Sequence, residues 1–374
     1  MTTTWHMLGR ILLKTTILLV LINGFFLLIT PDLSGLSLYN HLFPGRLRLP
    51  YGENPAQSYN LSLNNLDAMM HSHLINQPKA ADEFRVVLLG DSGVWGWFLE
   101  NEDTLAGQLN QMGLTTADGQ RIVVYNLGYP LMSLSKDLLL LQEALPHEPD
   151  LILWLVTLQS FPWSQQLEPP LLQQNPERLI PLINQYDLAL NPNDPRFVRP
   201  TPWEQSIIGQ RRALADLLRL QLVGVSWAAT GVDQAIPAEI PLRQSDFAAD
   251  VSWLDYPEPL ALDETILAWA VLQAGVTLAG DVPVVLVNEP IFVSDGENSD
   301  LRYNAWYPRW AYDDYRERLG DAAAVHNWPY LDLWDAIPPA EFTDSPVHLT
   351  ATGVGLLAGI VGGERGVLTT DFTD

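Results

Sequence analysis

Apolar residues form one long run near the N-terminus and a series of short runs after it. Residues 11–29 are apolar except for Lys14, two threonines, Asn23 and Gly24. A membrane-spanning helix needs roughly 20 mostly apolar residues, and a lysine near one end can extend its ammonium group to the interface. The pattern predicts one membrane-length helix.

The charges beside this run predict its orientation. Arg10 and Lys14 precede the core at residues 17–29, and the first 30 residues contain no acid. Basic flanks stay cytoplasmic, so the rest of the chain is expected outside the cytoplasm. A cleaved signal peptide is the alternative because the core is short, but no A-x-A-like site follows. We therefore predict a retained anchor over residues 1–30.

Residues 31–83 are punctuated by Pro, Asn and Ser, and contain a weakly helical stretch at residues 61–75. We interpret them as a stalk that packs on the following domain. His71 and His73 lie within this stretch, but adjacent-but-one residues do not share a helix face. Both side chains are therefore expected in solvent rather than on a metal ion.

From residue 84 onward, short apolar runs alternate with helical periodicity. The runs predict strands at residues 85–89, 122–125, 151–156, 282–287 and 330–333. Helices are predicted at residues 104–112, 134–145, 263–278, 312–323 and 351–360. Apolar runs bounded by turn residues are typical of parallel strands covered on both faces, and this alternation predicts a doubly wound α/β sheet.

Proline and tryptophan interrupt this alternation at about residues 161–256. We interpret that region as an irregular insertion over the sheet, with one helix at residues 206–223. The predicted organisation is thus an anchor at 1–30, a packing segment at 31–83, and a domain at 84–374 that carries the insertion.

Composition excludes several classes of function. The 374 residues include 44 acidic and 20 basic side chains, giving a net charge of -24, which disfavours nucleic acid as a partner. The absence of cysteine excludes disulfides, thiolate chemistry and Cys-ligated zinc, and no cofactor or metal is expected. The 13 tryptophans are expected mostly in the core; for Trp95 and Trp97, lining a crevice is the less favoured alternative.

A serine and a histidine carry the candidate chemistry. Ser92 lies in the Gly-Asp-Ser turn at residues 90–92, at the carboxyl end of the first strand, where open α/β sheets bind ligands. A serine hydroxyl needs a base, and His348 precedes the last predicted helix. Asp344 is close enough to accept the second ring proton, although Glu341 or a backbone carbonyl could do so instead. Capping and packing are the structural alternatives for Ser92 and His348.

Acyl transfer also needs hydrogen-bond donors for the oxyanion. The backbone N–H groups of Ser92 and Gly128 are candidates, because both residues follow neighbouring strands. The side-chain amide of Gln159, after the third strand, could supply another donor or could satisfy local backbone. Asp91 is expected to hold the turn rather than to react.

These residues resemble the blocks of the SGNH, or GDSL-like, hydrolase family. The Gly-Asp-Ser turn matches at residues 90–92, and Asn-Leu-Gly at residues 126–128 resembles the second block. Two blocks depart from the family pattern. Thr-Leu-Gln-Ser at residues 157–160 replaces Gly-x-Asn-Asp, and three residues rather than two separate Asp344 from His348.

The resemblance covers roughly residues 84–160 and 263–361. It implies a flavodoxin-like three-layer fold and a Ser-His-Asp mechanism. The function so implied is a membrane-anchored, extracytoplasmic serine esterase or O-acyltransferase that acts on acyl or acetyl esters of cell-envelope glycans or lipids. The alternative is a catalytically inactive SGNH-like protein that binds envelope components.

Overall fold

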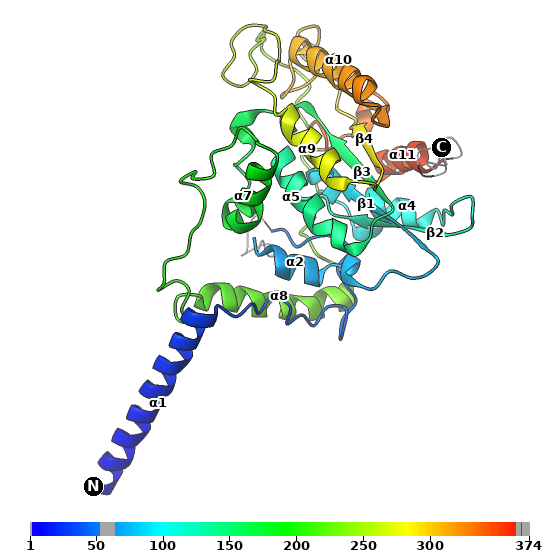
Figure 1. The fold of residues 1–374 in the computed structure, drawn as a ribbon. Helices are drawn as coiled ribbons and strands as arrows, with labels where there is room; N and C mark the ends of the chain where they lie inside the picture. Colours follow the sequence, from blue (N-terminus) through cyan, green and yellow to red (C-terminus); the bar gives the residue numbers. More distant parts are fainter. Residues whose placement is uncertain (1, 53–63, 364–367, 369–374) are drawn as a thin grey trace.

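The computed structural model describes residues 2–52, 64–363 and 368 (Figure 1). Its centre is a five-stranded sheet in the order β2-β1-β3-β4-β5, in which every neighbouring pair is parallel. The strands are β1 (Glu83–Leu89), β2 (Arg121–Asn126), β3 (Leu151–Val156), β4 (Val284–Asn288) and β5 (Tyr330–Asp332). The predicted doubly wound, flavodoxin-like α/β class is confirmed.

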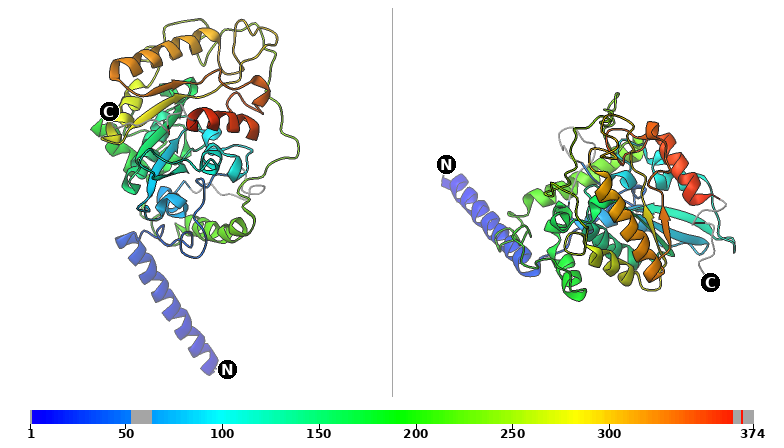
Figure 2. Two further views of the ribbon diagram at one scale, coloured as in Figure 1. Left: turned by 90° about the vertical axis from the view of Figure 1, so that its right-hand side faces the viewer. Right: turned by 90° about the horizontal axis from the view of Figure 1, so that it is seen from above.

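Helices cover both faces of the sheet, because alternate side chains of each buried strand point to opposite sides. Val87 and Leu89 belong to the apolar cluster that includes helices α5, α9 and α10, whereas Val86 and Leu88 pack with α4 and α11. The helix bounds are α4 (Leu105–Gln111), α5 (Leu134–Ala144), α9 (Trp269–Ala279), α10 (Arg309–His326) and α11 (Ala351–Gly362). The result is a three-layer fold in which the sheet lies between two layers of helices (Figures 1 and 2).

Side-chain caps set the starts of several of these helices. Thr104, Ser133 and Thr350 each accept a hydrogen bond from a backbone N–H in the first turn of α4, α5 and α11. The helix predicted at residues 263–278 begins later, at Trp269. The carboxylate of Asp263 accepts hydrogen bonds from the N–H and the hydroxyl of Thr265. These two bonds form a turn where the helix was predicted to start.

The region at residues 161–256 only partly forms a separate layer. Helices α6 (Pro170–Gln174) and α7 (Pro176–Gln185) place leucines in the α5–α9 cluster and so belong to the core. The helix predicted at residues 206–223 is observed as α8 (Arg211–Thr230). It starts later because residues 202–210 form turns, and it ends at Gly231, whose φ of 72° breaks the helix.

The N-terminal segment contains α1 (Thr2–Ile29), which projects from the domain (Figure 1). Residues Trp5–Ile29 are long and apolar enough to cross a membrane by length and composition. Of the stretch predicted to be weakly helical, residues 61–63 lie outside the described residues, and the remainder forms α2 (Leu66–Ser72) and a short 3-10 turn. The solvent prediction for His73 is wrong: its ring is fully buried, and its Nδ1 accepts the N–H of Ile75.

Candidate active site

Ser92 is presented by a tight turn after β1. Gly90 has a φ of +154°, and a Cβ there would lie 2.5 Å from Val94, so this position requires glycine. Asp91 caps the short helix α3 (Ser92–Trp95) by accepting the N–H of Gly93 at 2.7 Å. Ser92 therefore starts a helix at the carboxyl edge of the sheet, and the carboxylate of Asp91 holds the turn.

The structure brings Ser92, His348 and Asp344 together. Nε2 of His348 lies 2.8 Å from Oγ of Ser92, and Nδ1 lies 2.8 Å from Oδ1 of Asp344. The histidine thus touches a hydroxyl on one side and a carboxylate on the other. This arrangement allows Nε2 of the ring to take a proton from Ser92 while the N–H at Nδ1 continues to donate a hydrogen bond to Asp344.

The additional residue between Asp344 and His348 is accommodated in a closed loop. The N–H of Thr343 donates to the carbonyl of His348 at 2.8 Å, and the hydroxyl of Ser345 accepts the N–H of His348 at 3.2 Å. The closed loop therefore brings the carboxylate of Asp344 into contact with the ring of His348. Glu341, the alternative partner, instead accepts the hydroxyl of Thr350.

The local charges keep Asp344 ionised. Burial alone would raise the pKa of its carboxyl, but the hydrogen bond and charge of His348 outweigh burial, and the pKa lies below the ordinary value of 3.8. An ionised carboxylate at Nδ1 stabilises the imidazolium that forms when Ser92 gives up its proton.

Trp97 lies beside the histidine of the site. Its indole stacks on the His348 ring, with centroids 5.8 Å apart and planes inclined by 23°. Trp95 instead is buried and donates from Nε1 to the carbonyl of Leu49 at 2.8 Å. Packing in the core therefore describes Trp95, whereas Trp97 lies against His348, and crevice lining by Trp97 stays a prediction. Sequence spacing alone does not distinguish the two indoles.

The two backbone N–H groups expected as oxyanion donors differ in whether they already have an acceptor. The N–H of Ser92 has no acceptor among the described residues. The N–H of Gly128, in contrast, donates to Oδ1 of Asn126 at 3.0 Å, so in this conformation it is not available, contrary to expectation. A Cβ at Gly128 would lie 2.6 Å from the nitrogen of Trp95. Gly128 thus allows close packing against the helix that carries Ser92.

Gln159 lies in a 3-10 turn (Leu158–Ser160) directly after β3. Its backbone N–H contacts the hydroxyl of Tyr307 at 3.4 Å. The side chain lines a cavity of ≈ 330 Å³ together with Ser252, Trp306 and neighbouring residues. Within the described part of the chain, no hydrogen bond joins the amide to Ser92 or to local backbone.

A buried ion pair supports the turn from below. Lys136 is fully buried, and its Nζ donates to the carbonyls of Gly90 and Tyr129 at 2.7 and 2.6 Å. It also pairs with Asp137 at 2.9 Å. Burial raises the pKa of Asp137, an effect that the charge of Lys136 opposes. Lys136 thereby ties helix α5 to the residue two positions before Ser92.

Glu289 is a second buried acid that sequence reasoning missed. It follows β4 directly and is almost fully buried. Burial, together with the nearby charges of Asp91 and Asp137, raises its pKa well above the usual value. Its position directly after an apolar strand, at the sheet's carboxyl edge, is the sequence feature that could have indicated that it lies near the site.

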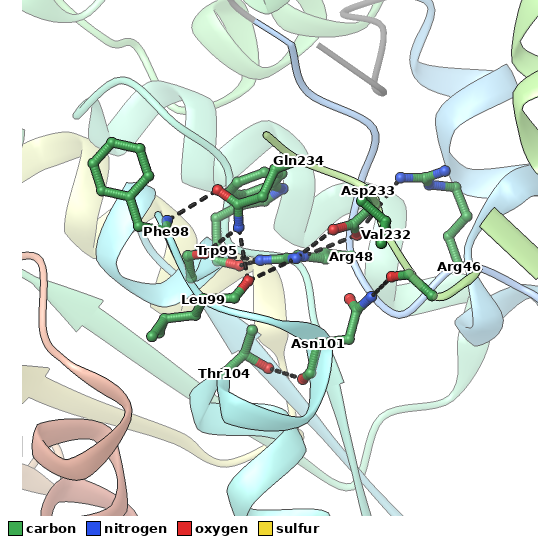
Figure 3. Close-up of polar contacts among 12 residues, drawn as sticks. Arg46, Arg48, Trp95, Phe98, Leu99, Asn101, Thr104, Val232, Asp233 and Gln234 are labelled. Carbon is green, nitrogen blue, oxygen red and sulfur yellow. Dashed lines mark hydrogen bonds and ion pairs between the residues drawn. The ribbon is translucent and has the colours of Figure 1, made fainter. Parts of the chain in front are cut away.

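Residues 231–247, called here the strap, contact both loops that carry the reacting side chains. Gln234 donates from Nε2 to the carbonyls of Gly96 and Leu99, each at 2.8 Å, and accepts the N–H of Phe98 at 2.9 Å (Figure 3). The loop after Ser92, which includes Trp97, is therefore fixed by hydrogen bonds from a segment remote in sequence.

The other end of the strap holds the histidine loop. The N–H of Arg243 donates to the carbonyl of Thr343 at 2.7 Å. Its guanidinium donates to the carbonyls of Phe342 and Pro339 at 2.8 and 2.7 Å and lies over the ring of Phe292. Neither Gln234 nor Arg243 belongs to a motif, so sequence reasoning missed both.

Comparisons with known proteins find similarity among solved structures. No family model matches this sequence, and no curated protein matches it. Solved structures with similarity to the chain include a lipase/acylhydrolase from Enterococcus faecalis, at 16% identity over 75% of this chain and 94% of that chain, with a TM-score of 0.35. They also include a member of the lipolytic G-D-S-L family from Veillonella parvula (11% identity, 75% and 98% covered, TM-score 0.35). A third is Est24, a carbohydrate acetylesterase from Sinorhizobium meliloti (11% identity, 75% and 97% covered, TM-score 0.34).

Proposed function

We propose that this chain is a membrane-anchored, extracytoplasmic serine ester hydrolase or O-acyltransferase. The observation that carries the proposal is the continuous contact from Ser92 through His348 to Asp344, with both distances at 2.8 Å. The three groups come from opposite ends of the domain, and capping or packing would not require them to meet in this order.

In the proposed mechanism, Oγ of Ser92 attacks the acyl carbonyl while Nε2 of His348 takes the hydroxyl proton. Collapse of the tetrahedral intermediate breaks the ester C–O bond, and His348 returns the proton to the leaving alcohol. The acyl group then remains on Ser92. Water releases it in a hydrolase, and a second hydroxyl accepts it in a transferase.

The negative charge that develops on the carbonyl oxygen needs donors. The free N–H of Ser92 supplies the first one. We assign the second to the amide of Gln159, which follows the neighbouring strand and has no hydrogen-bond partner in the described ranges. Tightening of such contacts on substrate binding is usual for catalytic sites.

The location follows from α1. The basic residues near its N-terminal end support a start of the chain in the cytoplasm and a domain at residues 84–374 outside. The ester substrates available there are acylated or acetylated envelope glycans and lipids. The rival proposal, an inactive protein that binds such molecules, is favoured only by the departures at residues 157–160 and between Asp344 and His348.

Hydrolysis of a small chromogenic acetyl ester by the membrane-embedded protein tests the activity. The wild type should turn the ester over, and Ser92→Ala should reduce the rate to background while the thermal unfolding temperature stays unchanged. Equal rates in the two proteins would refute the triad and favour the binding protein. Protease added to intact cells should digest the domain if it is outside.

A further inference from the structure

Helix α8 exposes an apolar stripe. Leu218, Leu222 and Val225 are 60%, 62% and 51% exposed, and their spacing of four and three residues places them on one face of the helix. The opposite face is also apolar, since Leu220 and Trp227 are buried against Tyr39. A helix that is apolar on both sides has buried only one of them in the domain.

The helix lies at the base of the domain, on the side from which α1 leaves (Figures 1 and 2). The N–H of Ile208, just before α8, donates to Oδ1 of Asn23 in α1 at 3.2 Å. Helix α8 then runs across the base while α1 projects away from it (Figure 1). The start of α8 therefore lies beside α1, and the helix that carries the exposed stripe runs from there across the base of the domain (Figure 1).

The charge of α8 differs from that of the chain as a whole. It contains three arginines and one aspartate, whereas the chain carries a net charge of -24. Arg211 and Arg212 are exposed at the helix start, close to the point where α1 joins. Basic side chains beside an apolar face are typical of helices that lie in a membrane interface.

We propose that α8 lies in the interfacial layer of the same bilayer that α1 crosses. Leu218, Leu222 and Val225 enter the boundary of the acyl chains, and Arg211 and Arg212 contact lipid phosphates. The inference rests on the membrane-anchor part of the proposed function. It adds a second, non-spanning contact between the domain and the lipid surface.

This contact would fix the position of the active site relative to the lipid surface. The carbonyl of Gly231, which ends α8, accepts a hydrogen bond from Asn101 at 2.9 Å. Two residues later, Asp233 pairs with the buried Arg48, whose guanidinium also donates to the carbonyls of Gly96 and Leu99 (Figure 3). A helix held in the interface is thus joined directly to the loop that follows Ser92.

The absence of cysteine allows a direct test in the full-length protein. Single cysteines at Leu222 and Val225 would carry a nitroxide spin label after reconstitution into phosphatidylcholine–phosphatidylglycerol vesicles. Leu18→Cys in α1 is the lipid reference. Val325→Cys is the aqueous reference, because Val325 is 75% exposed on α10, at the far side of the domain (Figure 1). Collision rates with oxygen and with a water-soluble nickel complex are then measured.

The Leu222 and Val225 labels should have an oxygen-to-nickel ratio several-fold above that of Val325 and below that of Leu18, as expected for an interfacial depth. If Leu18 is in lipid but both α8 labels match Val325, the inference is overturned and the anchor stands. If Leu18 itself is open to nickel, the anchor fails and the inference with it. If the α8 labels are shielded from both reagents and dilution of the protein in lipid relieves this, a second copy covers α8, which also overturns the inference.

Discussion

The carboxylate of Asp344 lies 2.8 Å from Nδ1 of His348, although three residues separate the two along the chain. The loop that joins them closes on itself through Thr343 and Ser345. The spacing that departs from the family pattern therefore does not separate the acid from the base.

Asp344→Asn should lower kcat for ester hydrolysis by about 10⁴-fold while the fold remains intact. An amide cannot stabilise the imidazolium, and its NH₂ group would favour the wrong ring tautomer. Steady-state kinetics on a chromogenic ester measures the effect. Glu341→Gln is the matched control and should retain activity, because Glu341 contacts Thr350. A comparable loss of kcat in Glu341→Gln would contradict the prediction, because it would mean that Asp344 alone does not orient His348.

The strands were predictable because buried parallel strands are short, wholly apolar runs with turn residues at their ends. The predicted run at residues 151–156 coincides with β3. The position of Ser92 at the sheet's carboxyl edge was predictable for a related reason, because that edge is where open α/β sheets bind ligands. His348 was singled out by its place on the loop before the last predicted helix, and the catalytic roles of both residues stay predictions. The meeting of Asp344 with His348 was one of several open alternatives, and loop closure decides it.

Other parts of the site depend on contacts that spacing does not encode. Gly128 carries a donor that its own neighbour Asn126 takes, and this competition is visible only in three dimensions. Arg243 lies in an irregular segment and reaches the histidine loop across about 100 residues of sequence. Irregular segments have no hydrophobic period from which such contacts could be inferred.

Gln159→Ala should lower kcat by about 10²–10³-fold with little change in KM, because the charge that the amide meets exists only in the transition state. Gln159→Asn should restore activity only if the shorter side chain still reaches the oxyanion. Initial-rate kinetics on both variants measures the effects. A rise in KM with unchanged kcat would instead place Gln159 in a substrate-binding cavity with Trp306.

His73 should make the protein sensitive to mild acid. Burial lowers the pKa of its ring to about 3 from 6.5. Between these two pH values the ring is protonated in the unfolded chain and neutral in the folded protein. The stabilising contribution is complete above pH 6.5. As the pH falls from 6.5 towards 3, the free energy of unfolding should fall by about 1.4 kcal/mol per pH unit from this group.

Urea unfolding of wild type and His73→Gln as a function of pH isolates this contribution. The variant should lose the part of the acid dependence that His73 supplies, about 1.4 kcal/mol per pH unit below pH 6.5. The remaining dependence comes from other groups, such as His147, whose pKa burial also lowers. His41→Gln is the control, since His41 is exposed, and it should keep the wild-type dependence. Identical pH profiles for wild type and His73→Gln would contradict the buried, neutral ring.

Lys136→Met should destabilise the protein by about 3–5 kcal/mol, because it leaves Asp137 as an unpaired buried charge. The carbonyls of Gly90 and Tyr129 also lose their donor. The double variant Lys136→Met/Asp137→Leu should recover part of this loss, since Asp137 is then no longer a buried charge without its partner. The recovery should be incomplete, because Asp91 also loses the nearby charge of Lys136. Chemical denaturation measures both. A double variant less stable than the single one would show that the ion pair is not the source of the penalty.

Arg243→Ala should lower kcat by about 10–100-fold while leaving KM largely unchanged. Arg243 touches neither Ser92 nor the His348 ring, but its guanidinium holds the carbonyls of Phe342 and Pro339. Without these contacts the loop that carries Asp344 and His348 is free to shift, and a displacement of about 1 Å in a catalytic group can cost 10²-fold.

The matched control for Arg243 is Arg309→Ala. Arg309 also lies over an aromatic ring, that of Tyr303, and donates to a backbone carbonyl, that of Ser299, but it has no contact with the histidine loop. Both variants should lose a similar amount of stability on chemical denaturation, whereas only Arg243→Ala should lose kcat. Arg243→Lys should recover little, because one ammonium group cannot reach two carbonyls with the geometry of the planar guanidinium. Equal kcat in Arg243→Ala and Arg309→Ala would mean that the histidine loop holds its own position, through the Thr343 and Ser345 hydrogen bonds, without the strap.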